Sequence, residues 1–171
     1  WPAYTVALAA GRSELKHLAH IISCQPRYNL CFRTFERDLL PLCQEEGIAV
    51  IPSNPMAGGF LSGKHNRAAP PPEGRFTLGW AGSVYQQRYW NERQFDTIEV
   101  LQGVAEEAGM SLATLAVSWV LSNPAITAPI VGASKMNHLD DAIAALSVKL
   151  GDDEAKRLEE PYKPHAVADH E

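Results

Sequence analysis

A short glycine-containing segment, residues 54–59, is the first part of the sequence whose composition suits a particular chemistry. It lies just beyond an apolar run at residues 48–51 and contains the pair Gly58-Gly59. Glycine carries no Cβ, so the backbone N–H groups beside it can approach phosphate oxygens closely. A plain turn has the same composition, and at this point both interpretations stay open.

Residues 64–93 form a basic stretch within an acidic chain. They contain five Lys or Arg and two Asp or Glu, a local net charge of +3, whereas the whole chain carries −5. A basic loop suits a ligand that has several phosphate charges. A solvated surface loop explains the same charges equally well, in particular those of Arg88 and Arg93.

Gln25 ends a mostly apolar run, residues 21–25, directly before Pro26. A glutamine side chain offers both a donor and an acceptor, and strand ends are where barrel proteins build their sites. An ordinary structural polar residue is the alternative. His17 and His20 are three residues apart, but no third ligand is in register, so the sequence does not favour a zinc site.

Composition and charge exclude several classes of protein. The cysteines Cys24, Cys31 and Cys43 are too few and too irregular for a disulfide framework, and for Cys24 and Cys43, which have apolar surroundings, we expect free, buried thiols. No run approaches the roughly 20 apolar residues of a membrane span, and no signal peptide opens the chain. The net charge of −5 argues against general binding of nucleic acid or anionic membranes. We therefore expect a cytoplasmic protein with neither of these partners.

Apolar runs bounded by Gly and Pro predict a parallel sheet. The runs at residues 21–25, 48–51 and 128–131 are typical of buried strands, and helical patterns separate them. Such alternation implies right-handed βαβ units. Residues 53–90 lack periodicity, which predicts a long loop that is either functional or disordered.

Helices are predicted from apolar spacing and from start and stop residues, at 2–10, 33–46, 91–109, 112–121, 137–146 and 152–160. Gly11 and Gly47 should end the first two helices. Pro41 should kink the second helix, because proline has no backbone N–H to donate. Asn91 and Ser111 are the expected N-caps of the third and fourth helices.

Three parallel strands cannot close into a barrel on their own. An eight-stranded barrel typically needs about 250 residues, whereas this chain has 171. The chain is therefore either a small open α/β domain or part of a barrel. It begins with Trp1 rather than Met, and we take this as the mark of a cut rather than of a processed start.

Five sequence blocks, in order, carry a resemblance to a known family. They are residues 25–29, 36–43, 47–55, 57–64 and 129–135. The blocks resemble the aldo-keto reductases and look closest to the bacterial and fungal branch that includes potassium-channel β-subunit relatives. The resemblance implies that the chain is the C-terminal half of an eight-stranded (β/α)8 TIM barrel. Residues 1–171 would then be part of one oxidoreductase domain whose long cofactor and substrate loop lies near 53–90.

The resemblance also implies a reaction, hydride transfer from NADPH to a small-molecule aldehyde or ketone. The family's catalytic Asp, Tyr, Lys and His come from the N-terminal half and have no counterpart in this sequence. We therefore expect the stretch alone to be inactive and to need the missing N-terminal half-barrel, or to associate with itself through open strand edges. A non-catalytic protein that binds NADP or pairs half-barrels is the alternative.

Cofactor contacts, according to the resemblance, come largely from this half. Gln25 would bind the nicotinamide carboxamide, residues 54–59 would surround the pyrophosphate, and Lys64 and Arg75 would clamp it. The region 132–135 would hold the adenosine 2′-phosphate through a hydroxyl and a point charge, which favours NADP(H) over NAD. The expected cofactor contacts are Gln25, Ser53, Asn54, Pro55, Met56, Ala57, Gly58, Lys64, Arg75, Gly132, Ser134, Lys135, His138 and Asp141.

Three positions depart from the family pattern. Ser53 stands where relatives usually place an aromatic ring against the nicotinamide, and serine cannot stack. Ala142 replaces an adenine-reading Asn, and His138 replaces a common Gln but can still form a hydrogen bond. We therefore expect weak cofactor binding. No metal site is expected, and none of the catalytic residues lies in this stretch.

Overall fold

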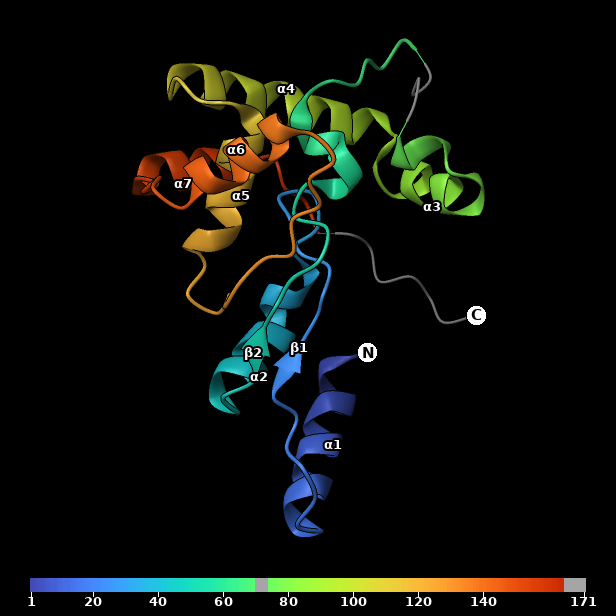
Figure 1. Cartoon of the computed structure of the whole chain (residues 1–171), viewed down its shortest axis with the longest axis vertical. Helices are drawn as coiled ribbons and strands as arrows, with labels where there is room; N and C mark the ends of the chain where they lie inside the picture. Colours follow the sequence, from blue (N-terminus) through green and yellow to red (C-terminus); the bar gives the residue numbers. More distant parts are fainter. Residues whose placement is uncertain (70–73, 165–171) are drawn as a thin grey trace.

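The computed structural model describes residues 1–69 and 74–164, which form several helices and one very small sheet (Figure 1). The elements, in chain order, are α1 (Ala3–Leu15), β1 (Ser23–Cys24), η1 (Thr34–Arg37), α2 (Leu39–Glu45), β2 (Ala49–Val50), η2 (Ala57–Ser62), η3 (Arg75–Thr77), α3 (Gly79–Tyr89), α4 (Glu92–Glu107), α5 (Leu112–Ser122), α6 (Met136–Ala145) and α7 (Asp152–Glu159). In Figure 1, α1, α2 and the two strands occupy the lower part, and α3–α7 gather in the upper part.

The sheet has two parallel strands, paired as Ser23 with Ala49 and Cys24 with Val50. A third segment, residues 127–130, lies along the free edge of β2. The Thr127 N–H donates to the Val50 carbonyl at 2.9 Å, and the Ile130 N–H donates to the Pro52 carbonyl at 2.8 Å. The sequence predicted a third strand at 128–131, but the described residues form no regular strand there.

Pro129 explains this difference. It has no N–H to donate, so the ladder that Thr127 begins is interrupted before Ile130. The neighbouring Ala128 N–H shares the carbonyl of Val50 with Thr127, at 3.4 Å. The apolar run therefore occupies the predicted place beside β2 without making the regular hydrogen bonds of a strand.

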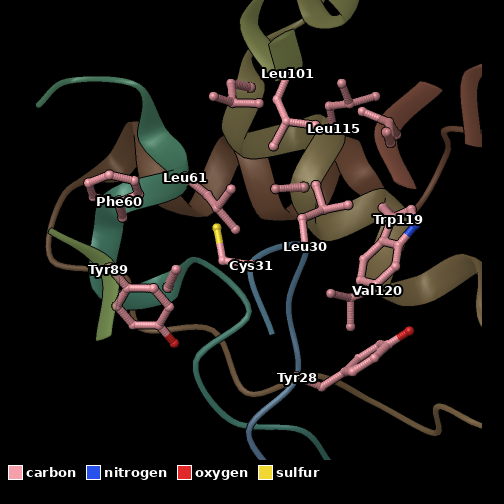
Figure 2. Packing of buried hydrophobic residues seen from close by; sticks show 14 of the residues in the cluster. Tyr28, Leu30, Cys31, Phe60, Leu61, Tyr89, Leu101, Leu115, Trp119 and Val120 are labelled. Carbon is pink, nitrogen blue, oxygen red and sulfur yellow. The ribbon is translucent and has the colours of Figure 1, made fainter. Parts of the chain in front are cut away.

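The largest part of the core lies between α4, α5 and the segment that follows β1. Leu30 and Cys31 come from that segment and are each 1% exposed. Figure 2 shows them pointing toward Leu61 and toward Leu101 of α4 and Leu115 of α5. Burial of such side chains stabilises each of them by roughly 1.5–3 kcal/mol, so this packing fixes where the chain after β1 runs.

Two predicted helix boundaries were wrong. The helix α1 continues through Gly11 to Leu15, because an exposed glycine only costs about 1 kcal/mol within a helix and does not end it. The helix predicted at 33–46 is divided at Asp38, whose Oδ1 accepts the Leu39 N–H at 2.7 Å. Pro41 then falls in the first turn of α2, where its missing N–H costs nothing, so no kink forms.

The long loop predicted at 53–90 contains the eleven-residue helix α3. Its sequence has no apolar periodicity, because only Gly82 and Tyr89 of this helix are buried. Residues 70–73 of the predicted loop lie outside the described residues. The remaining boundaries agree closely with prediction, and the side chains of Asn91 and Ser111 cap α4 and α5 as expected.

An ion-pair network joins the chain after β1 to α7. Arg33 pairs with Glu36 at 2.9 Å and with Glu159 at 2.9 Å, and its side chain is 13% exposed. Tyr28 donates to Glu36 at 2.6 Å, and Trp119 of α5 donates to Glu159 at 3.1 Å. Because these charges are partly desolvated and each has a partner, the network ties three distant elements into one geometry.

Within the described ranges, no single helix is long and apolar enough to cross a membrane; α4 and α5 satisfy that test only as a pair bent by 94°.

Candidate functional site

The chains that follow β1 and β2 continue side by side past the ends of the strands. The Ser53 N–H donates to the Pro26 carbonyl at 2.8 Å, and the Tyr28 N–H donates to the Ser53 carbonyl at 3.3 Å. Gln25 and Ser53 therefore lie at the same carboxyl edge, beside the third segment that ends at Ile130. Open and closed parallel sheets build their ligand sites at this edge.

Gln25 is exposed at this edge, and Ser53 is half-buried. The Ser53 hydroxyl donates to the carbonyl of Pro26 at 3.4 Å, a long hydrogen bond that leaves the side chain directed along the edge. The edge therefore offers an amide side chain and a small hydroxyl, and the Ser53 position provides no aromatic face.

The loop after β2 has an unusual backbone. Asn54 and Ala57 have positive φ values of 62° and 49°, and Gly58 and Gly59 have values of 73° and 98°. Asparagine tolerates this left-handed region better than most residues do. The Asn54 Oδ1 accepts a hydrogen bond from the Gly58 N–H at 2.5 Å. The side chain of the first residue of the turn therefore bonds to the backbone at its end.

A side chain of α3 lies against this loop. A Cβ placed on Gly58 would lie 2.5 Å from Cδ1 of Tyr85, so only glycine fits beneath the ring. The Tyr85 hydroxyl accepts a long hydrogen bond from the Arg75 Nη1, at 3.4 Å. The Arg75 Nη2 in turn lies 3.5 Å from the position of a Cβ on Gly132. Tyr85 thus lies against Gly58 and contacts Arg75, and Arg75 lies beside Gly132.

Lys64 lies elsewhere along the same stretch. It is exposed and borders a hollow of about 330 Å³ against α4, whose lining includes Phe95 and Ile98. The next arginine, Arg67, is held by carboxylates of α4, with Glu92 at 2.7 Å. The structure therefore places Arg75 beside Gly132 and Tyr85, and it places Lys64 beside α4.

The segment 132–138 begins α6 and carries exposed polar groups. Ser134 and Lys135 are exposed. The Ser134 N–H donates to Nδ1 of His138 at 3.4 Å, so the imidazole lies beside the first turn of the helix. An N-terminus of a helix presents unpaired N–H groups, which favour a negative charge.

Asp141, which the resemblance associates with the adenine, has partners within the chain. Its Oδ1 accepts hydrogen bonds from Ser111 at 2.7 Å and from Thr114 at 3.2 Å. These bonds attach α6 to the start of α5 and so fix the direction of α6. A contact between Asp141 and a cofactor stays a prediction.

The aromatic residues of the long stretch pack mostly against each other. Phe76 and Tyr89 are each 1% exposed, whereas Trp80 is 84% exposed. His65 lies between Phe76 and Trp90, at ring-centroid distances of 5.0 and 5.1 Å. Burial lowers the pKa of His65. Phe76 and Tyr89 therefore pack inside the molecule, whereas Trp80 lies on its surface.

The three cysteines are free, and burial raises the pKa of Cys31 to about 12 and that of Cys43 to about 11. Cys31 and Cys43 are therefore protonated near neutral pH and behave as small apolar side chains, whereas Cys24, which was expected to be buried, is half-buried. Among residues 1–69 and 74–164, no three His, Cys, Asp or Glu side chains lie close enough together to hold a metal ion. His17 and His20 accordingly form no such group in this part of the chain.

Comparison with known proteins decides the family. Residues 5–163 match the model of the Aldo/keto reductase family. The chain belongs to this family. It is 36% identical over 150 residues to the versiconal hemiacetal acetate reductase of Aspergillus parasiticus, a match that covers 85% of this chain and 41% of that protein. The resemblance inferred from the five sequence blocks is thereby confirmed.

Two further relatives illustrate the breadth of the family. Aldo-keto reductase dtxS3 of Metarhizium robertsii is 32% identical over 160 residues, covering 92% of this chain and 41% of the relative. An Arabidopsis thaliana protein named "Probable voltage-gated potassium channel subunit beta" is 31% identical over 149 residues. This match covers 86% of this chain and 45% of the relative. The chain spans less than half the length of these relatives. The family implies a (β/α)8 barrel, and the two-stranded structure is consistent with an incomplete barrel.

Sequence reasoning missed two polar residues beside the loop, Asn29 and Tyr89. Asn29 is fully buried, and its Nδ2 donates to the Asn54 carbonyl at 2.9 Å. The Tyr89 hydroxyl accepts a hydrogen bond from Nδ2 of Asn54 at 3.0 Å. Asn29 lies in a family-like block and Tyr89 lies in an aromatic stretch, but neither signal pointed to these contacts.

The contact between Gly58 and Tyr85 predicts a difference between neighbouring glycines. Gly58→Ala and Gly59→Ala both place a side chain at positive φ, but only the first also meets the Tyr85 ring. We expect Gly58→Ala to lower the free energy of unfolding by about 1–3 kcal/mol more than Gly59→Ala does, as overpacking does. Urea denaturation measures this difference.

Tyr85→Ala provides the control for that prediction. In the Tyr85→Ala background the ring is gone, so Gly58→Ala and Gly59→Ala should cost similar free energies, and the double-mutant cycle isolates the contact. Equal losses for the two glycine variants in the wild-type background would show that Tyr85 does not pack on Gly58.

Proposed function

We propose that residues 1–171 are the C-terminal part of one aldo/keto reductase domain, which reduces aldehydes or ketones to alcohols with NADPH once an N-terminal half-barrel completes it. Family membership supports the class of reaction. The observation that carries the proposal is a series of contacts: Tyr85 lies against Gly58 in the loop after β2, and its hydroxyl accepts a hydrogen bond from Arg75, which in turn lies beside Gly132. Loops from different strands converge there, as they do at barrel sites.

The residues present fit a dinucleotide with phosphate groups. The loop 54–59 has a left-handed backbone at Asn54, Gly58 and Gly59, a conformation common in loops that face anions. Arg75 lies beside Gly132 and contacts Tyr85, whose ring covers this loop, and its planar guanidinium can bind a diphosphate through two hydrogen bonds. Gln25 and Ser53 would face the nicotinamide from the strand ends. The bound cofactor would supply the hydride.

The start of α6 fits the additional phosphate that distinguishes NADP from NAD. Ser134 contributes a hydroxyl and Lys135 a point charge, and both are exposed at the N-terminus of a ten-residue helix. His138 lies close enough to share the same anion, since it contacts Ser134. These groups support NADP(H) as the cofactor.

Two exposed apolar faces fit an N-terminal half-barrel as the missing partner. One lies on α1 and includes Tyr4, 69% exposed; the other lies on α6 and includes Ile143, 55% exposed. The exposed apolar residues of these two helices are Leu8, Leu15, Met136 and Leu139, together with Tyr4 and Ile143. Contiguous apolar surface of this kind marks an interaction face, and the free edge of β1 adds unpaired backbone groups.

Lys135→Ala tests the cofactor assignment. Removal of a charge-assisted contact to the 2′-phosphate should weaken NADPH binding by about tenfold and leave NADH binding unchanged within about twofold. Titration of each dinucleotide into the chain, followed by tryptophan fluorescence, measures both affinities. Lys149→Ala is the matched control, because this exposed lysine lies beyond the other end of α6. Equal weakening of NADPH and NADH, or no NADPH binding by the wild-type chain at millimolar concentration, would contradict the proposal.

Ile143→Asp tests the half-barrel partner. A charge on the apolar face of α6 should abolish association with the N-terminal half of a family member expressed as a separate chain. Val100→Asp is the control, since Val100 is also apolar and 49% exposed but lies on α4. Sedimentation measures the complex and aldehyde-dependent NADPH oxidation measures its activity. If the chain associates with itself and does not bind the N-terminal half, the result would favour the alternative function, a non-catalytic protein that pairs with its own copy.

A further inference from the structure

Residues 63–69 form a strap that runs along α4, in the opposite direction to the helix (Figure 1). At its start, the Gly63 carbonyl accepts a hydrogen bond from Nε2 of Gln102 at 3.3 Å. Near its end, Arg67 pairs with Glu92 of the same helix at 2.7 Å. The strap is therefore fastened to α4 at both ends.

His65 lies between these two fastenings, within a group of aromatic rings. Its ring is stacked with that of Phe60 at a centroid distance of 6.0 Å, and it meets Phe76 and Trp90 edge to face at 5.0 and 5.1 Å. Both ring nitrogens are buried, and neither has a hydrogen-bond partner in the described part of the chain. Leaving a neutral imidazole unpartnered costs free energy, and a desolvated imidazolium costs considerably more.

The elements that supply these rings carry cations and no carboxylate. Lys64 precedes His65 in the strap, Arg75 begins η3, and Arg88 lies in the last turn of α3, whereas η2 has no titratable side chain. Burial raises the pKa of Tyr89, the other titratable group of that last turn, so its hydroxyl stays neutral. Burial, and then the charge of Lys64, lowers the pKa of His65 from its ordinary value. A proton on His65 is therefore disfavoured where the ring lies.

The side of the strap that faces α4 offers carboxylates and space. His65 and Glu99 both line the hollow of about 330 Å³ between the strap and this helix. Glu99 binds Arg67 at 2.7 Å. Two further acids of α4, Glu92 and Asp96, hold the same guanidinium, so it keeps partners if Glu99 turns toward another cation. The hollow therefore offers an imidazolium both water and a carboxylate.

We propose that His65 is a pH-sensitive anchor of the strap: neutral, it packs among the three aromatic rings, and protonated, it leaves them for the hollow beside Glu99. This inference goes beyond the proposed function and needs no cofactor. Well above pH 6.5, about the ordinary pKa of histidine, the ring is neutral in both positions and the anchor holds fully. At lower pH the released ring takes up a proton before the packed ring does. Release is then favoured by up to about tenfold per pH unit, until the packed ring also titrates.

Proton NMR of the whole chain between pH 7.5 and 4.5 tests the anchor directly. The His65 ring should titrate with a midpoint below pH 6.5. Nuclear Overhauser contacts between His65 and Phe76, whose rings are 5.0 Å apart, should be present at pH 7.5 and disappear with the same midpoint. The indole resonance of Trp90, which also meets the His65 ring, should shift over the same range.

His65→Phe is the matched variant, because it keeps an aromatic ring in the group and cannot take up a proton. The shift of the Trp90 resonance should then be lost over this pH range. His20→Phe is the control: it removes an exposed histidine that lies before β1, so the behaviour of His65 and Trp90 should stay as in the wild-type chain.

Glu99→Gln tests where the released ring goes. Without this carboxylate the released imidazolium loses its partner, so the midpoint of His65 should fall by a further 0.3–0.7 pH unit or so, about the strength of an exposed ion pair. Glu92→Gln removes an equal charge from the Arg67 cluster, on a residue that does not line the hollow, and should change the midpoint by less.

Several outcomes would overturn the anchor. One is a His65 ring that titrates at or above pH 6.5, or that takes up no proton down to pH 4.5. Another is a protonated His65 that keeps its Overhauser contacts with Phe76. A Trp90 shift that persists in His65→Phe would assign the change to a different group. Equal midpoints in Glu99→Gln and Glu92→Gln would overturn the hollow as the position of the released ring.

Discussion

Backbone pairing beyond the ends of β1 and β2 is the constraint on which the rest of the site depends. The regular strands are two residues long, yet Pro26, Tyr28 and Ser53 keep the two chains paired well past them. This pairing sets the starting point of the loop 54–59 and places it beside the chain that leads to Gly132. Without this backbone pairing, loop 54–59 and the chain that leads to Gly132 would have no fixed position relative to each other.

Packing of the segment after β1 against the helices explains why the paired chains keep a fixed path beyond the strands. Leu30 and Cys31 enter the core under α4 and α5, and Arg33 then ties the same segment to α7 through Glu159. Apolar burial stabilises the fold of this segment. The ion pairs fix its orientation, because charge-assisted hydrogen bonds require a specific geometry. The helical part of the molecule thus holds a site that is built mainly from loops.

Sequence patterns predicted the elements whose stability is local. Asn91 and Ser111 cap their helices as expected, since a capping side chain needs only the N–H groups that follow it. The helix α3 was not predicted, because so few of its residues are buried that its sequence has no apolar repeat. The segment 128–131 took the predicted place beside β2, but Pro129 removed the hydrogen bond that a strand needs there. For the site, family-like blocks indicated the loop 54–59, whereas contacts between distant residues, such as Asn29 and Tyr89 with Asn54, follow only from the tertiary structure.

Amide hydrogen exchange with and without NADPH tests the central claim most directly, that loop 54–59 and the start of α6 hold one dinucleotide. The account predicts that NADPH slows exchange at residues 56–59 and at 132–135 together, while the exposed end of α1 near Leu15 stays unchanged. Uniform slowing across the chain would indicate general stabilisation instead of a site. Slowing confined to other segments, with residues 56–59 exchanging at their original rate, would contradict the account.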